Sequence, residues 1–167
     1  MKTLYIIRHA QSSPIISDVS DFDRPLNKRW ELDAEMIWKR LNKKNIYPDI
    51  IYSSSAKRAK QTCQQICKEI KYPWENTIYK QKIYDNHINW IDFYLWFIME
   101  IINTYNEVFL IWHNNVWSEL ASYLLWQDIG ILPTCWVITI SFNIESWNEV
   151  WYSNGKLWFF ISPKTED

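Results

Sequence analysis

Apolar residues along this chain of 167 residues fall into short runs that alternate with stretches of helical periodicity. The short runs are rich in β-branched and aromatic residues, which favour buried strands. Between them, apolar residues recur three or four positions apart, as on the buried face of an amphipathic helix. This alternation predicts an α/β fold, a three-layer sandwich in which helices cover both faces of a mainly parallel sheet.

The pattern also places the individual elements. We expect strands at residues 3–7, 50–52, 78–84, 108–112, 137–142 and 157–161. We expect helices at residues 27–45, 56–70, 88–105 and 118–125. Asn27 is a suitable N-cap for the first helix, and Asn154-Gly155 suits a hairpin turn before the last strand, so the final strands are expected to be antiparallel. No repeat, linker or low-complexity tract interrupts the pattern, which indicates one domain.

Composition and charge exclude several classes of protein. Hydrophobic residues make up 48% of the chain and charged residues 22%, which excludes a disordered chain, a collagen and a disulfide scaffold. The net charge of −1 provides no overall field to hold nucleic acid or an anionic membrane, and the basic cluster at residues 39–44 is typical of a solvated helix end. Apolar runs fall short of the roughly 20 residues of a spanning helix, and Arg8 and His9 interrupt any signal peptide. We therefore expect a cytoplasmic protein with no nucleic-acid or membrane partner.

Cysteines and histidines are spread along the chain. They are Cys63, Cys67, Cys135, His9, His87 and His113. An odd number of cysteines fits a reducing compartment, and their simplest interpretation is as small buried hydrophobic residues. The histidines are too scattered for ligand spacing, so we expect neither a metal nor another cofactor.

Polar residues that can bind or react with phosphate lie just beyond three of the predicted strands. Arg8 and His9 come after the first strand, Arg58 opens the helix after the second, and His113 follows the strand at 108–112. Ligands bind beyond the carboxyl ends of the strands in such sheets. Guanidinium groups and helix N-termini suit a phosphate dianion, and neutral imidazole is a nucleophile that can take up a phosphoryl group. Each residue alone has a structural interpretation, but together they predict a phosphoryl site.

The segments around these residues resemble the histidine phosphatase superfamily, and within it the short SixA-like phosphohistidine phosphatases. The matching segments are Arg8-His9-Ala10, Arg24-Pro25-Leu26, Ser55 to Thr62 (SAKRAKQT) and His113-Asn114. The resemblance extends over residues 1–164, which leaves a short tail at 165–167. It implies a phosphoglycerate-mutase-like fold and a phosphatase that works through a covalent intermediate without a metal.

The resemblance also implies a role for individual residues. His9 would be the nucleophile that becomes phosphohistidine. Arg8, Arg58 and His113 would bind the phosphoryl oxygens, and Asn114 would help to shape the floor of the pocket.

The proton donor to the leaving group is less well defined. Asp85 is the carboxylate nearest the position at which the family has its proton donor, although Asp85 can also be interpreted simply as a solvated turn residue. Gln11, Ser12 and Asp23 lie in the first loop and could touch substrate, but the polarity of a loop explains them too. An imidazole leaving group would require less help from a protein acid than an alkoxide.

The expected substrate is a phosphohistidine on a signalling or phosphotransfer protein, with small phosphorylated metabolites as the second choice. The chain is short for a large cap over the site, which suits a bulky protein substrate. A mutase reaction normally accompanies longer insertions than this sequence has. A catalytically inactive phosphate- or partner-binding module of the same fold is the rival interpretation.

Two residue counts are abnormal, since the chain has 12 tryptophans and 2 glycines, whereas average usage would give about 12 glycines. By resemblance, the family commonly has glycine at Trp30, Trp112, Trp117, Trp126 and Trp136. Tryptophan at strained glycine positions costs about 1–3 kcal/mol each. We therefore interpret many of these residues as glycines: in a genetic code that reads UGA as glycine, translation with a table that reads UGA as tryptophan would give this pattern. The alternative is a real chain with an aromatic-rich surface. The intact mass of the protein from its native source distinguishes the two.

Trp112 and Trp117 matter most for the rival interpretation. They flank the predicted phosphate pocket, where glycine would let backbone N–H groups approach the oxygens. An indole there is expected to fill the pocket or to displace His113. Asn115 also stands where the family commonly has proline.

Overall fold

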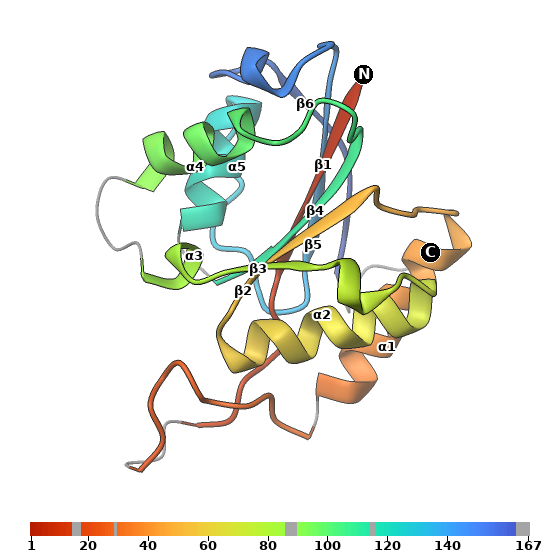
Figure 1. The fold of residues 1–167 in the computed structure, drawn as a ribbon, viewed down its shortest axis with the longest axis vertical. Coiled ribbons are helices and arrows are strands. Elements are labelled where there is room, and N and C mark those ends of the chain that lie inside the picture. The colour runs from red at the N-terminus through yellow and green to blue at the C-terminus, as the bar shows by residue number, and fades with distance from the viewer. Residues whose placement is uncertain (15–17, 29, 86–89, 114–115, 163–167) are drawn as a thin grey trace.

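A mixed sheet of six strands lies between two layers of helices (Figure 1). This computed structural model describes residues 1–14, 18–28, 30–85, 90–113 and 116–162. The strands are β1 (Lys2–Arg8), β2 (Ile50–Ser54), β3 (Ile78–Lys80), β4 (Glu107–Trp112), β5 (Val137–Phe142) and β6 (Gly155–Ile161). The helices are α1 (Trp30–Lys43), α2 (Lys57–Ile70), α3 (Lys82–Asp85), α4 (Trp90–Met99) and α5 (Val116–Leu125), with short 3₁₀ turns η1 (Trp74–Asn76) and η2 (Trp147–Glu149).

The strands are ordered β3-β2-β4-β1-β5-β6 across the sheet. Strands β3, β2, β4 and β1 are parallel to one another, whereas β5 is antiparallel to both of its neighbours, β1 and β6. This arrangement confirms the predicted mainly parallel sheet with antiparallel final strands. None of the helices in the described part of the chain is long and apolar enough to cross a membrane.

Side chains alternate between the two faces of the sheet, as period-two geometry requires. In β4, Val108 and Leu110 join the core beneath α4 and α5, while Phe109 and Ile111 join the core beneath α1 and α2. Both faces of the central strands are therefore buried, which explains their continuous apolar runs. The predicted three-layer sandwich is confirmed.

The start of the first long helix follows the prediction from Asn27. Its Oδ1 accepts a hydrogen bond from the backbone N–H of Trp30 at 3.1 Å, where α1 begins. The cysteines at 63, 67 and 135 are all buried and form no disulfide, as expected for small hydrophobic residues. The boundary between domain and tail at residue 164 lies outside the described residues.

The segment at 78–84 is only partly a strand, so that prediction is wrong in its second half. Strand β3 lies at the edge of the sheet and pairs with β2 over three positions, from Ile78 to Lys80. The chain then turns into α3, where the carbonyl of Gln81 accepts hydrogen bonds from the N–H groups of Tyr84 (2.7 Å) and Asp85 (3.1 Å). This turn carries Tyr84 toward the carboxyl ends of the strands.

The helix predicted at 88–105 is shorter, because α4 ends at Met99; residues 88 and 89 lie outside the described residues. Beyond it, the ammonium of Lys2 donates to the carbonyl oxygens of Asn103 and Tyr105, the latter at 3.1 Å. Periodicity alone could not reveal that a buried lysine from the first strand takes these carbonyls.

The tight hairpin turn predicted at Asn154-Gly155 is also wrong. Gly155 is the first residue of β6 and lies opposite Phe142, so residues 143–154 form the connection. The connection contains η2, whose Trp147 is fully buried. A Cβ at Gly155 would lie 2.5 Å from Ile140 Cγ2, which explains glycine there by close packing.

The structure contradicts the expectation that an indole at 112 fills the pocket or displaces His113. Trp112 is 2% exposed and packs edge-on against Tyr94 and Phe97, with ring centroids 4.7 and 6.3 Å away. Alternation along β4 directs its side chain into the core beneath α4. The inactive-module interpretation loses this support.

The other tryptophans of this group lie in different settings. Trp126 follows α5 with a φ of 52° and is 71% exposed, a left-handed helix end that favours glycine. Trp136 stacks on Phe160 with an interplanar angle of 9°, and Trp30 opens α1. The side chain of Trp117 lies outside the described residues. Of the described positions in this group, Trp126 has the backbone conformation that the glycine interpretation predicts.

Candidate active site

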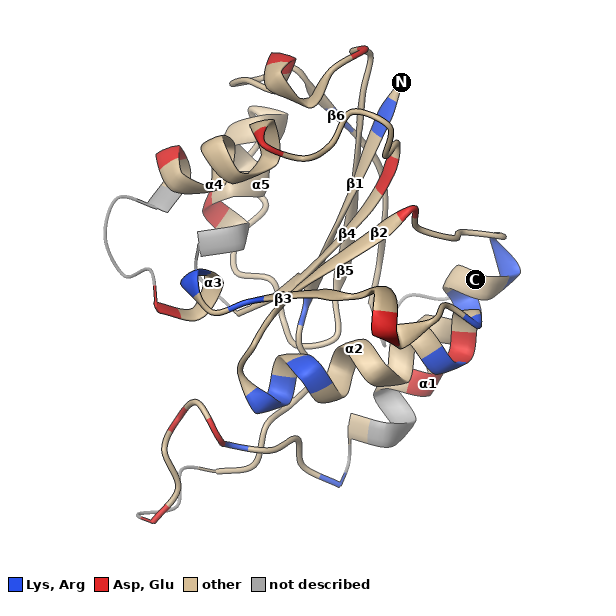
Figure 2. Cartoon of the chain, in the orientation of Figure 1, with Lys and Arg blue, Asp and Glu red and all other residues tan. Residues whose placement is uncertain are grey.

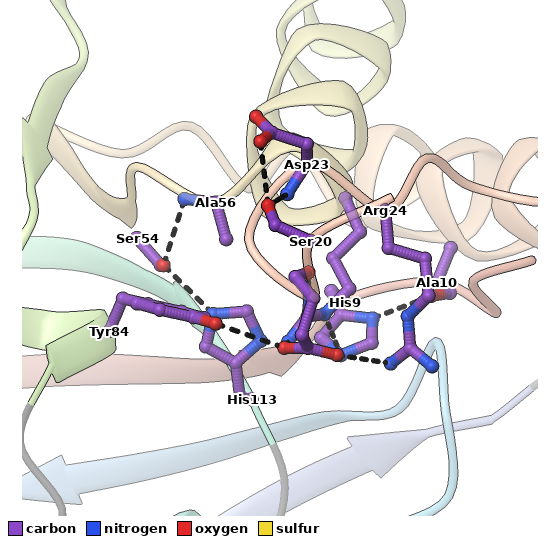
Figure 3. Close-up of polar contacts among 11 residues, drawn as sticks. His9, Ala10, Ser20, Asp23, Arg24, Ser54, Ala56, Tyr84 and His113 are labelled. Carbon is purple, nitrogen blue, oxygen red and sulfur yellow. Dashed lines mark hydrogen bonds and ion pairs between the residues drawn. The ribbon is translucent and has the colours of Figure 1, made fainter. Parts of the chain in front are cut away.

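The two histidines lie together where neighbouring strands end. Strands β1 and β4 pair in parallel with Arg8 opposite Trp112, so the next residue of each strand end is a histidine. The ring centroids of His9 and His113 are 5.0 Å apart, and the two imidazoles are adjacent in Figure 3. The structure therefore brings together the histidines that the strand ends predicted.

His9 is held as a neutral imidazole with a defined tautomer. It is 6% exposed, and its Nδ1 lies 2.6 Å from the carbonyl oxygen of Ala10. A carbonyl only accepts, so Nδ1 carries the proton and Nε2 presents its lone pair. Burial lowers the pKa of His9 to about 3; the Ala10 hydrogen bond opposes this shift, and the positive charges of Arg58, Arg8 and Arg24 add to it. The nucleophilic nitrogen is therefore unprotonated at neutral pH.

His113 is neutral for similar reasons. Burial lowers its pKa first, followed by the charges of His9 and the nearby arginines. Its Nε2 lies 2.8 Å from Ser54 Oγ at the end of β2, and Tyr84 contacts its ring edge-on with centroids 5.6 Å apart. Its Nδ1 is buried with no hydrogen-bond partner among the described residues. This nitrogen can bind a phosphoryl oxygen.

Arg58 lies against His9 at the start of α2, where Figure 2 shows basic residues gathered. It is buried, and its Nε donates to His9 Nε2 at 3.3 Å. One turn further along, Thr62 Oγ1 donates to the Arg58 carbonyl at 2.8 Å and accepts from the N–H of Ala10 at 3.0 Å. Gln61 Oε1 accepts from the N–H of Leu26 at 2.9 Å. The motif around Arg58 thus fastens both flanking loops to α2.

Arg8 and Arg24 add positive charge to the same place. Arg8 donates from Nη1 to the carbonyl of Leu132, and burial lowers its pKa. The Nε atoms of Arg8 and Arg24 are buried, and neither has a hydrogen-bond partner among the described residues. A buried donor without a partner is costly unless an anion takes it. Three arginines therefore surround two neutral imidazoles.

Several predicted residues do not join this cluster. Asp85 is exposed at the end of α3 and makes no side-chain hydrogen bond or ion pair within the described part of the chain. Asp23 accepts from Ser20 Oγ at 2.6 Å, Gln11 is exposed, and Ser12 bridges to the strand-like segment at Leu26. They shape the first loop. Asn114 lies outside the described residues.

Sequence reasoning missed Asp21 and Tyr84. The carboxylate of Asp21 lies 2.9 Å from Arg58 Nη2 and 3.0 Å from Arg24 Nη2. The hydroxyl of Tyr84 donates to the same carboxylate at 3.1 Å. Asp21 was one of several acidic residues in a polar loop, and Tyr84 belonged to a segment predicted as strand, so neither stood out in the sequence.

The buried neutral histidines make stability depend on pH. In the unfolded chain both imidazoles take up protons near pH 6.5, whereas in the folded chain His9 stays neutral down to about pH 3. The unfolded state binds more protons in this window, so the free energy of unfolding falls as pH falls. We expect a loss of about 2–4 kcal/mol between pH 7 and pH 5, measured by urea unfolding. The double variant His9→Gln, His113→Gln is the control; an equally steep pH dependence in it would contradict this assignment.

The α/β fold gathers two neutral histidines and three arginines into one site. Residues 4–78 match the family model of the histidine phosphatase superfamily (branch 1). The structure is similar to SixA from Agrobacterium tumefaciens, a candidate phosphohistidine phosphatase, with a TM-score of 0.81 and 23% identity over 97% of this chain and 98% of that one. It is also similar to the protein histidine phosphatase SixA in complex with tungstate, with a TM-score of 0.80 and 16% identity over 96% of this chain and 97% of that one.

A sequence relative covers nearly the whole chain as well. An uncharacterized chloroplastic protein of Arabidopsis thaliana is 26% identical over 159 residues, which are 92% of this chain and 72% of that protein. The match over residues 4–78 supports the resemblance to the histidine phosphatase superfamily, and the chain has the phosphoglycerate-mutase-like fold of the SixA structures.

Proposed function

We propose that the protein hydrolyses phosphohistidine through a covalent phosphohistidine intermediate on His9. The observation that carries the proposal is the buried, neutral imidazole of His9, whose unprotonated Nε2 faces the guanidinium of Arg58 at 3.3 Å. A nucleophile beside a fixed cation suits phosphoryl transfer, which depends on positioning and charge neutralisation.

The reaction proceeds in two balanced steps. His9 Nε2 attacks phosphorus, the P–N bond of the substrate breaks, and the substrate imidazole leaves with the electron pair and takes a proton from water. Arg8, Arg58 and His113 bind the phosphoryl oxygens. Water then attacks the phosphorus on His9 and gives up a proton to the hydroxide left by the first step, the P–Nε2 bond breaks with its electron pair returning to Nε2, and inorganic phosphate leaves while His9 is restored.

The acid–base character of the site favours an imidazole over an alkoxide as the leaving group. Burial would raise the pKa of Asp21, but the charge and hydrogen bonds of Arg58, with Tyr84 and Arg24, lower it below its ordinary value. Asp21 is therefore ionised and cannot donate a proton. Asp85 is exposed and takes no part in these hydrogen bonds. A leaving group that needs little acid catalysis suits such a site.

Leaving-group dependence tests the proposed substrate class. We expect kcat/KM for a phosphohistidine-bearing protein to exceed that for an alkyl phosphate by about 10²-fold or more, since general acid catalysis contributes about that factor. Release of inorganic phosphate at pH 7 measures both rates, and 4-nitrophenyl phosphate, whose leaving group is good, serves as the control. An alkyl phosphate hydrolysed as fast as phosphohistidine would contradict the proposal and favour a small-metabolite phosphatase.

A further inference from the structure

The carboxylate of Asp21 lies on the donors that a phosphoryl group needs. Its Oδ2 accepts from Arg58 Nη2 at 2.9 Å and from the Tyr84 hydroxyl at 3.1 Å. Its Oδ1 accepts from Arg24 Nη2 at 3.0 Å. Its backbone carbonyl also accepts from Arg58 Nη1 at 2.5 Å. One residue thus presents three oxygens to two arginines and a tyrosine.

These contacts use every nitrogen of the Arg58 side chain. Nε donates to His9, and both Nη groups donate to Asp21. A phosphoryl group bound to His9 Nε2 has its equatorial oxygens beside this same guanidinium. Asp21 takes one N–H of each Nη group, so a phosphoryl group that approaches both Nη groups from the same side competes with Asp21 for these donors.

The loop that carries Asp21 is attached to the protein through Phe22, whereas the side chain of Asp21 is half exposed to solvent. The Asp21 side chain is 49% exposed, compared with 6% for Arg58. The adjacent Phe22 is held by its carbonyl, which accepts from the N–H of Lys57 at 3.0 Å, and by its ring, which meets Tyr84 edge-on at 5.0 Å. Asp21 can therefore leave Arg58 by rotation of its side chain and a local shift of the backbone. The Phe22 anchors can stay in place.

We propose that Asp21 is an internal competitor for the phosphoryl site, which occupies the Nη donors of Arg58 until the phosphoryl group of the substrate displaces it. The proposal rests on the phosphoryl site proposed above. It makes Asp21 a residue that sets substrate affinity, because an anion that takes these Nη donors of Arg58 must first replace this carboxylate.

Binding of two unreactive anions tests the proposal independently of catalysis. Phenylphosphonate and benzenesulfonate have the same shape and three oxygens, but at pH 8 the first is mainly a dianion and the second a monoanion. Their dissociation constants are measured by isothermal titration calorimetry for the wild type, Asp21→Asn and Asp23→Asn. Asp23 is the matched control, since it lies in the same loop and contacts Ser20 instead of an arginine.

We expect Asp21→Asn to bind both anions about tenfold more tightly, since a hydrogen bond to a charged group is no longer broken on binding. Asp23→Asn should bind them as the wild type does. Tyr84→Phe, which removes one donor from the carboxylate, should tighten both anions by about two- to threefold.

The outcomes separate displacement from its alternatives. An equal fold-decrease in the dissociation constants of both anions supports displacement. A fixed repulsive charge acts twice as strongly on a dianion, so a fold-decrease for the dianion that is the square of that for the monoanion overturns displacement. Weaker binding of phenylphosphonate to Asp21→Asn also overturns it, because Asp21 would then position Arg58 in the bound state. If no variant binds phenylphosphonate, the phosphoryl site itself is wrong, and both proposals fail together.

Discussion

Replacing His9 with alanine is expected to lower phosphate release by about 10³-fold or more, because the covalent route through Nε2 is lost entirely. The site retains its three arginines, so binding of phenylphosphonate should persist. Steady-state kinetics with a phosphohistidine-bearing protein, together with titration calorimetry, measure the two effects separately. The substitution also removes a buried polar ring, so the unfolding midpoint of the variant is checked first.

His113→Gln is the matched comparison for this prediction. It removes an imidazole from the same crevice but leaves the nucleophile, so the expected loss is smaller, about 10–10²-fold. Equal losses in both variants would mean that His9 contributes binding alone. A His9→Ala protein that keeps more than a tenth of the wild-type turnover would contradict the assignment of the nucleophile.

Trp112→Gly is expected to destabilise the protein by about 4–6 kcal/mol, because it removes a fully buried indole and places glycine in a central strand. Most domains are stable by only about 5–15 kcal/mol, so this variant should lie close to unfolding at room temperature. The edge-on contacts with Tyr94 and Phe97 would be lost and a cavity left beneath α4. Thermal and urea unfolding measure the change.

Trp126→Gly is the control, because Trp126 is an exposed residue with a positive φ whereas Trp112 lies buried in a central strand. It relieves a φ of 52° on an exposed residue, so its effect should be neutral or stabilising by up to about 1 kcal/mol. A Trp112→Gly protein as stable as the parent would contradict the packing described here. It would support the interpretation that glycine is the residue encoded at 112.

The main features of the site follow from the strand ends. His9, His113 and Arg58 could be placed together because parallel strands end at one edge of a sheet: the two histidines directly follow buried apolar runs, and Arg58 opens the helix after another strand. The alternating β-branched and aromatic residues of the runs define the strands without reference to tertiary structure. Local pattern and topology were sufficient for this part of the site.

Other features depend on contacts that no local pattern encodes. Helix α4 ends in a turn in which the N–H of Ile101 donates to the carbonyl of Ile98, and beyond it Lys2 of the first strand takes the carbonyls of Asn103 and Tyr105. Asp21 meets the arginines because of the path that the first loop takes, and Tyr84 meets Asp21 because the chain turns into α3 after the edge strand β3. The side chain of Trp112 was misplaced because its neighbour in sequence, His113, faces the site while period-two alternation turns the indole into the core.

The most direct test of the account is detection of the phosphorylated enzyme. The protein is mixed with a phosphohistidine-bearing substrate, quenched in alkali, where phosphohistidine is stable, and digested for mass spectrometry. The account predicts one phosphate on the peptide that contains His9, formed within the first turnover and absent in His9→Ala. Sustained release of inorganic phosphate with His9 unmodified at every quench time, or with the phosphate on another side chain, would contradict it.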